Sequence, residues 1–240
     1  MNPNNYGVRL NKAMSMLGMC SRREADRLIT SGHILVNGIV VTELGTKIAS
    51  GDTISLSTGG SNVFSHEVTR RMWMYYKPVG LITSHRDPNG RATVFDDVTK
   101  KVRERMISIG RLDINSEGLL LLTNSGEVAR YAELPSTALE RRYRVRIFGN
   151  LSDDIISQLT MGVTVHGARY APMKLRRLQE PLGKNSWVEC ILTEGKNREI
   201  RRLFDYFGIA VNRLIRTHYG PYAIGNLRPG EIREVECLTL

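Results

Sequence analysis

The sequence contains no apolar run that approaches the roughly 20 residues needed to cross a bilayer. Its first residues, "MNPNNYGVRLNK", lack the basic, apolar and small-residue pattern of a secretory signal. We therefore expect a protein without a membrane partner.

Cysteine and histidine are scarce, with three and five residues in a chain of 240. The cysteines (Cys20, Cys190 and Cys237) are odd in number and far apart, and the histidines show no metal-ligand spacing. This pattern argues against a disulfide framework and a structural zinc site. Free thiols indicate a reducing compartment, so we expect a cytoplasmic protein without a bound metal.

Positive charge is abundant: 34 Lys and Arg residues against 24 Asp and Glu residues give a net charge of +10. Such a balance attracts polyanions, and phosphate contacts supply most of the non-specific affinity for nucleic acid. The cations also cluster. The segment "ERRYRVR" holds four arginines, and the segment 196–216 holds six cations against two acids.

The chain is long enough for one full domain and a small one. At the N-terminus, the spacing of apolar residues predicts a helix over 9–17, and "SRRE" is a capping box that starts a second helix at Ser21. Asn37 and Gly38 predict a tight hairpin turn, and one or two short strands follow. We expect a small domain over 1–60, a linker over 61–67 and an α+β domain over 68–240.

This order of elements resembles the alpha-L (S4-like) RNA-binding domain over roughly residues 8–56. The resemblance implies that a basic helix face binds structured RNA, with Lys12, Arg22, Arg23 and Arg27 as the candidate contacts. The alternative is that these cations only solvate an exposed helix face.

In the larger domain, "IGRLDINSEGLLLLTN" places Asp113 just before a run of four leucines. Such a run predicts a strand buried on both faces. By pattern alone, Asp113 is a turn residue, a partner of Arg111 or a functional carboxylate. In "ERRYRVRI" a period of two puts Tyr143 on the apolar face and three arginines on the other, and a core tyrosine remains an alternative.

The segment "NREIRRLFDYFG" predicts a helix capped by Asn197, with Ile200, Leu203 and Phe204 on its core face. Arg198, Arg201 and Arg202 border that face. Solvated or phosphate-binding arginines are the alternative for all three.

The stretch 109–124 resembles the signature of the pseudouridine synthases, and "YYKPVGLITS", "ERRYRVRIFG" and "LTEGKNREIRRLFDYFG" resemble three further motifs in order. The resemblance is to the branch that modifies ribosomal RNA, and "RTHYGPY" favours the large subunit. It implies a small alpha-L domain beside a synthase domain with a mixed, mainly antiparallel sheet and flanking helices. It also implies a catalytic Asp113, an active-site Tyr143, and an Arg201 that pairs with Asp113 and favours its charged form. One departure is that Arg198 and Glu199 stand where relatives often carry other polar residues, glutamine in the case of Glu199.

The expected reaction breaks a carbon–nitrogen glycosidic bond, turns the uracil and rejoins it through carbon, so neither a metal nor another cofactor is expected. We expect a monomer that acts on ribosomal RNA, free or in an assembly intermediate. The RNA contacts expected in the larger domain are Lys77, Arg111, Arg142, Arg144, Lys196, Arg198 and Arg202. The alternative function is a ribosome-assembly factor that binds ribosomal RNA without chemistry.

Overall fold

The computed structural model of the protein describes residues 7–64, 69–178 and 185–239. The chain divides into two compact units, Met1–Arg70 with Asn124–Gly126, and Arg71–Thr123 with Glu127–Leu240. The linker expected over 61–67 stays a prediction, because its last three residues lie outside the described residues.

The first unit packs two helices against short strands. The helices are α1 (Leu10–Met16) and α2 (Arg22–Thr30). A sheet has the order β3 (Ile39–Val41), β2 (Ile34–Val36), β5 (Thr53–Leu56) and β6 (Ser61–Val63), and β1 (Val8–Arg9) pairs with β4 (Lys47–Ile48). Apolar residues of both helices and of four strand or loop positions form one core.

The expected start of α2 and the expected hairpin turn are confirmed, while only the Ser21 half of the capping box is present among the described residues. The Ser21 hydroxyl caps α2 by accepting a hydrogen bond from the Glu24 N–H at 3.2 Å. Asn37 and Gly38 join β2 and β3 with φ of 51° and 82°, the positive values that a two-residue hairpin turn requires.

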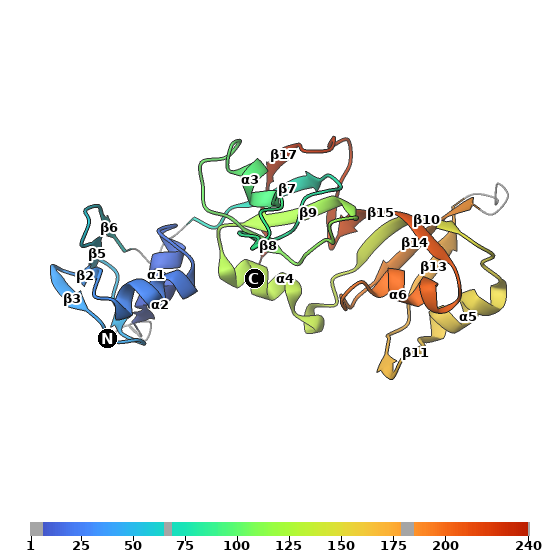
Figure 1. Ribbon diagram of the computed structural model, residues 1–240, viewed down its shortest axis with the longest axis horizontal. Helices are drawn as coiled ribbons and strands as arrows, with labels where there is room; N and C mark the ends of the chain where they lie inside the picture. Colours follow the sequence, from blue (N-terminus) through green and yellow to red (C-terminus); the bar gives the residue numbers. More distant parts are fainter. Residues whose placement is uncertain (1–6, 65–68, 179–184, 240) are drawn as a thin grey trace. The chain divides into compact units, whose positions relative to one another are not determined.

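The second unit is built on a long mixed sheet (Figure 1). Its strands run in the order β13 (Lys174–Arg177), β14 (Asn185–Leu192), β10 (Arg141–Phe148), β15 (Ala210–Tyr219), β9 (Glu117–Thr123), β7 (Met72–Lys77) and β17 (Ile232–Val235). Two short strands, β8 (Ile107–Ile109) and β16 (Tyr222–Ala223), pair with β9 and β15, while β11 (Thr164–Val165) and β12 (Ala168–Arg169) form a separate hairpin. All described strand pairs of this sheet are antiparallel except β9 with β15, which confirms the expected fold class.

Four α-helices lie in or border this unit within the described residues: α3 (Val94–Val98), α4 (Gly126–Glu133), α5 (Asp153–Met161) and α6 (Glu199–Tyr206). A 3-10 turn covers Pro135–Thr137. Figure 1 shows α5 and α6 beside β10, β13 and β14, and α3 beside β7 and β17. None of the helices in the described ranges has the length and apolar character that a membrane crossing requires.

The leucine run forms β9, and all seven residues of this strand are buried. Leu119 and Leu121 pack in the cluster that contains residues of α4, while Leu120 and Leu122 pack in the cluster that contains residues of α3. The prediction of a strand covered on both faces is confirmed, and the loop that carries Asp113 leads directly into it.

Candidate active site

The loop from Leu112 to Ser116 is fixed through its backbone. Three of its carbonyl oxygens accept hydrogen bonds of 2.8 Å from outside the loop, Ile114 from the Gly80 N–H, Asn115 from Arg201 Nη2, and Ser116 from Lys77 Nζ. The Thr83 hydroxyl also donates to the Leu112 carbonyl at 2.9 Å. The loop is therefore held from β7, from the segment after it and from α6, which leaves the Asp113 side chain free to face outward.

Asp113 forms an ion pair with Arg198, whose Nη1 lies 3.4 Å from Asp113 Oδ2. The Asp113 side chain keeps 29% of its surface exposed, so the carboxylate is both paired and accessible. Arg198 is the residue before α6 and has a left-handed backbone with φ of 51°. A non-glycine residue in this region is uncommon and is often found at functional sites.

The expected pairing of Arg201 with Asp113 is wrong in this structure. Arg201 donates from Nη2 to the Asn115 carbonyl and from Nη1 to the Val211 carbonyl, both at 2.8 Å. Burial, helped by the nearby Arg198 charge, lowers the pKa of Arg201, and the Asp113 charge acts in the opposite direction. Arg201 thus lies near Asp113 but clamps the backbone of its loop, while Arg198 supplies the direct ion pair.

The expected N-cap of α6 is also wrong. Arg198 occupies the cap position without a side-chain bond, and Asn197 Oδ1 instead accepts from Arg202 Nη2 at 3.0 Å. The left-handed conformation of Arg198 makes the chain turn at that residue, so the helix begins one position later than the cap pattern indicates.

Tyr143 lies on the inward face of β10, as the alternation predicts. It packs against both clusters of apolar residues on this side of the sheet, one with Val145 and residues of α6, the other with Leu112. Its neighbours across β14 and β15 are Cys190 and Arg216. The Tyr143 ring therefore packs against the cluster that includes Leu112, the residue before Asp113.

Lys77 cannot be an RNA contact, because its side chain is completely buried. Its Nζ donates to the carbonyls of Pro78 and Ser116 at 2.9 and 2.8 Å. Burial lowers the pKa of Lys77 to about 8, although the charges of Asp113 and Glu117 oppose this shift. The lysine points into the protein because it ends β7, whose residues on both faces are covered.

The other cations that the sequence singled out are exposed, except for the half-buried Lys12. The exposed ones are Arg22, Arg23, Arg27, Arg111, Arg142, Arg144, Lys196, Arg198 and Arg202. Arg142 and Arg144 extend from the opposite face of β10 to Tyr143, with the Arg144 guanidinium 5.1 Å from the centre of the Trp187 ring. The structure thus pairs Arg198 with Asp113 and places Arg142 and Arg144 on the face of β10 opposite to Tyr143.

The sequence did not indicate one buried arginine, Arg216, as a site residue. Arg216 is 3% exposed, donates from Nε to the Leu119 carbonyl at 2.7 Å, and has no hydrogen-bond partner for Nη2 within the described residues. Arg216 lies opposite Tyr143 where β10 pairs with β15. Its positive charge contributes to the lowered pKa of Lys77. The basic segment 196–216 indicated it only as one cation among six.

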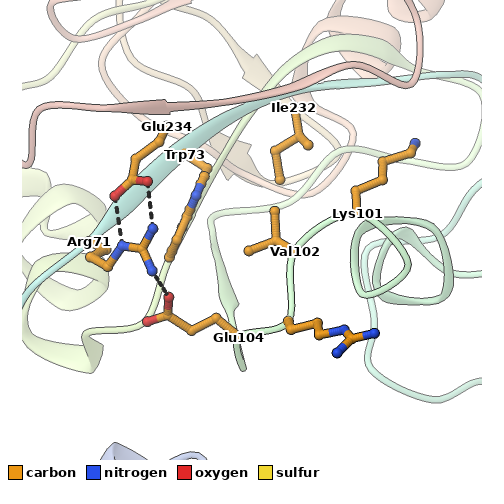
Figure 2. A pocket seen from close by; sticks show the side chains of 8 residues that line it. Arg71, Trp73, Lys101, Val102, Glu104, Ile232 and Glu234 are labelled. Atoms are coloured by element: carbon orange, nitrogen blue, oxygen red, sulfur yellow. Dashed lines mark hydrogen bonds and ion pairs between the residues drawn. The ribbon is translucent and has the colours of Figure 1, made fainter.

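A cavity of about 440 Å³ lies elsewhere in the second unit, and three of the charged side chains that line it form a structural network (Figure 2). Arg71 donates to both carboxylate oxygens of Glu234, at 2.7 and 2.6 Å, and also pairs with Glu104. Its guanidinium lies 5.0 Å from the centre of the Trp73 ring. Arg71, Glu234 and Glu104 thus bind one another in Figure 2 and join the residue before β7 to β17 and to the segment before β8.

The Asp113 site combines an accessible carboxylate and a guanidinium paired with it, and Tyr143 packs against the apolar cluster that includes the preceding residue, Leu112. A family model for RNA pseudouridylate synthase matches residues 71–206, and an S4 domain model matches residues 8–54. The chain belongs to the RNA pseudouridylate synthase family. The enzyme is therefore an isomerase that acts on RNA, with an S4 domain at its N-terminus.

Similar proteins cover almost the whole enzyme. An uncharacterized RNA pseudouridine synthase of Rickettsia bellii is 50% identical over 227 residues, 95% of this chain and 96% of the relative. The ribosomal large subunit pseudouridine synthase B of Haemophilus influenzae is 40% identical over 221 residues, 91% of this chain and 61% of the relative. A crystal structure of a pseudouridylate synthase shares the fold, with a TM-score of 0.65, 23% identity and coverage of 95% and 96%.

Proposed function

We propose that the enzyme converts specific uridines of ribosomal RNA, with the large subunit favoured, to pseudouridine at the Asp113 site. The observation that carries the site assignment is the accessible Asp113 carboxylate paired with Arg198 on a loop held from three sides. The substrate class is supported by the Haemophilus influenzae relative, whose name specifies the large ribosomal subunit. We further infer a cytoplasmic monomer whose substrate is free rRNA or an assembly intermediate.

Asp113 is the catalytic residue of this proposal. The reaction breaks the bond between C1′ of the ribose and N1 of uracil, rotates the base and forms the bond between C1′ and C5. The proton on C5 leaves, and N1 gains one, so atoms and electrons balance without a redox partner. A carboxylate serves here as a nucleophile at the sugar or base, or as a general base for the C5 proton. Both roles need an ionised carboxylate, and Arg198 lies 3.4 Å from it as its ion-pair partner.

Tyr143 is the second catalytic residue of this proposal, and Arg201 is a positioning residue. The Tyr143 ring has an apolar setting in which it can stack on uracil, and its hydroxyl can take part in proton transfer. Arg201 acts through the loop, because its guanidinium fixes the Asn115 carbonyl. We propose that Arg198 orients the Asp113 carboxylate directly.

The target uridine is flipped out of the RNA in this proposal, because an enzyme that acts on a base must remove it from the stack. Exclusion of water then protects the broken glycosidic bond from hydrolysis. Arg111, Lys196 and Arg202 are exposed around the loop and α6, where they would contact phosphates near the flipped base. Arg142 and Arg144 would contact RNA that passes the opposite face of β10.

The alternative, an rRNA-binding assembly factor without chemistry, explains the basic surfaces equally well. It does not explain Asp113, because a carboxylate in the middle of an RNA site repels phosphate and weakens binding. Whether turnover requires Asp113 therefore distinguishes an enzyme from a non-catalytic assembly factor.

The test replaces Asp113 with Asn, which keeps the size of the side chain and removes its charge. We expect Asp113→Asn to abolish release of tritium from C5 of uridine-labelled rRNA, while RNA affinity stays similar or increases. The matched control is Asp205→Asn, which changes an exposed aspartate of α6 and should retain turnover. Turnover by Asp113→Asn would contradict the catalytic assignment. If the unmodified enzyme had no turnover on any rRNA, the function as an rRNA-binding assembly factor would be favoured instead.

A further inference from the structure

Two carboxyl groups meet at the start of α6, close to the residue that pairs with Asp113. Glu199 is the first residue of α6 and is only 4% exposed. Its side chain is in hydrogen-bond contact with that of Glu194, which precedes it in the turn after β14. Two ionised carboxylates in contact would repel each other, so the pair needs either a cation between its oxygens or a proton.

The surrounding donors satisfy three of the four carboxyl oxygens. Glu194 Oε1 accepts from the Ala171 N–H at 2.7 Å, and Glu194 Oε2 accepts from Lys196 Nζ at 2.5 Å. Glu199 Oε2 accepts from the Lys196 N–H at 2.9 Å. Glu199 Oε1 is buried, and no other residue in the described part of the chain donates to it.

Lys196 pairs with Glu194 but leaves Glu199 Oε1 without a donor. Its ammonium contacts Glu194 and the Arg169 carbonyl, at 2.5 and 2.6 Å, and lies 5.2 Å from the centre of the Tyr170 ring. The charged groups that act on the Glu199 carboxyl are therefore Glu194, which disfavours ionisation, and Lys196, which favours it. A proton shared between Glu199 and Glu194 would account for Glu199 Oε1, the one oxygen of the pair that lacks a donor in the described residues.

We propose that Glu199 is a positioning residue that works in its protonated form: it donates a hydrogen bond to Glu194 and so fixes the turn that presents Arg198 to Asp113. The inference rests on the proposed function of the Asp113 site. Burial, followed by the contact with Glu194, raises the pKa of Glu199 to about 8, which agrees with a neutral group at physiological pH. Although burial acts upward on Glu194, hydrogen bonds from Glu199, Lys196 and Ala171 hold the pKa of Glu194 below its usual value.

The connection to Arg198 is short and covalent. The turn 196–199 is closed by the Glu199 N–H bonded to the Lys196 carbonyl at 3.2 Å and by the Lys196 N–H bonded to Glu199 Oε2. Arg198 lies between these two residues in its left-handed conformation. A backbone of that kind persists only where its surroundings hold it. Ionisation of Glu199 against Glu194 would loosen the turn and release Arg198 from Asp113.

The experiment compares the unmodified enzyme with Glu199→Gln, which donates the same hydrogen bond at every pH, and with Glu199→Ala, which donates none. Asp205→Asn on the same helix is the control. Single-turnover rates on rRNA are measured from pH 6 to pH 10. We expect Glu199→Gln to stay within about twofold of the unmodified enzyme near pH 6.5, and its rate relative to that enzyme to rise about tenfold per pH unit above pH 8. We expect Glu199→Ala to be slower by about tenfold or more throughout.

A second readout does not depend on turnover. NMR of enzyme with labelled glutamate follows the carboxyl carbons, and the signal that disappears in Glu199→Gln belongs to Glu199. We expect the chemical shift of this signal to titrate near pH 8. Titration near the ordinary glutamate range, or a pH-independent rate ratio, overturns the proposal. If the carboxyl titrates near pH 8 in an enzyme without turnover on rRNA, the proton-sharing pair stands and the proposed function fails.

Discussion

Arg198 and Arg201 reach the Asp113 loop in different ways. Arg198 is exposed at 45% of its side chain and touches the carboxylate itself. Arg201 is half-buried, its two Nη atoms hold backbone carbonyls of Asn115 and Val211, and its Nε has no hydrogen-bond partner among the described residues. The first contact acts on the proposed catalytic carboxylate, while the second set of contacts joins the loop to β15.

This difference predicts that one alanine substitution lowers mainly stability and the other lowers mainly turnover. Arg201→Ala leaves two carbonyls without a donor and should lower the free energy of unfolding by about 1–3 kcal/mol. Arg198→Ala removes an exposed ion pair, so the free energy of unfolding should change by no more than about 0.5 kcal/mol, while turnover falls by about tenfold or more. Urea unfolding and turnover on rRNA measure the two quantities. Equal stability losses would show that both arginines are structural.

At the scale of elements, strict periodicity made much of the fold predictable. The unbroken leucine run gave a strand covered on both faces, and the alternation around Tyr143 gave its inward direction. Long side chains were harder, because an arginine spans several ångströms and its partner depends on strands far away in the sequence. The burial of Lys77, the exchange of roles between Arg198 and Arg201, and the cap of α6 all depend on such contacts.

The two halves of the large sheet are joined by one parallel pair, β9 with β15. This ladder is short, with Ile215 opposite Glu117 and Arg216 opposite Gly118. Gly118 has a φ of +104°, and a Cβ at this position would lie 2.3 Å from the Arg216 carbonyl oxygen. The glycine is therefore what allows the two strands to approach.

Gly118→Ala should separate this pair and lower the free energy of unfolding by more than about 3 kcal/mol, because both a backbone clash and a positive φ oppose it. Gly126→Ala, at the start of α4 with open space around it, is the control and should be neutral or stabilising by up to about 1 kcal/mol. Chemical denaturation of both variants makes the comparison. A Gly118→Ala protein as stable as its parent would mean that the sheet halves do not depend on this contact.

At the scale of the whole molecule, the Asp113 site and the exposed arginines of α2 lie in different units. The second unit holds the paired carboxylate, while the S4 domain has two exposed arginines, Arg22 and Arg23, in the first turn of α2. Cations at the N-terminus of a helix oppose its dipole and cost stability. Their placement has no benefit for the helix, which favours the proposal that these arginines bind phosphate.

The double substitution Arg22→Glu with Arg23→Glu separates binding from chemistry. Acidic residues suit the start of a helix, so the fold of the S4 domain should be retained or stabilised. The KM for rRNA should rise by about tenfold or more and the salt dependence of binding should weaken, because each lost phosphate contact removes about 0.7–0.9 from the slope of log K against log salt. At saturating rRNA, kcat should stay within about twofold, since no reacting atom is touched. The control Arg22→Lys with Arg23→Lys keeps both charges and should bind nearly as well. An unchanged KM and salt slope in the glutamate variant would mean that the two arginines only solvate the helix, and RNA would then have to be held by the second unit alone.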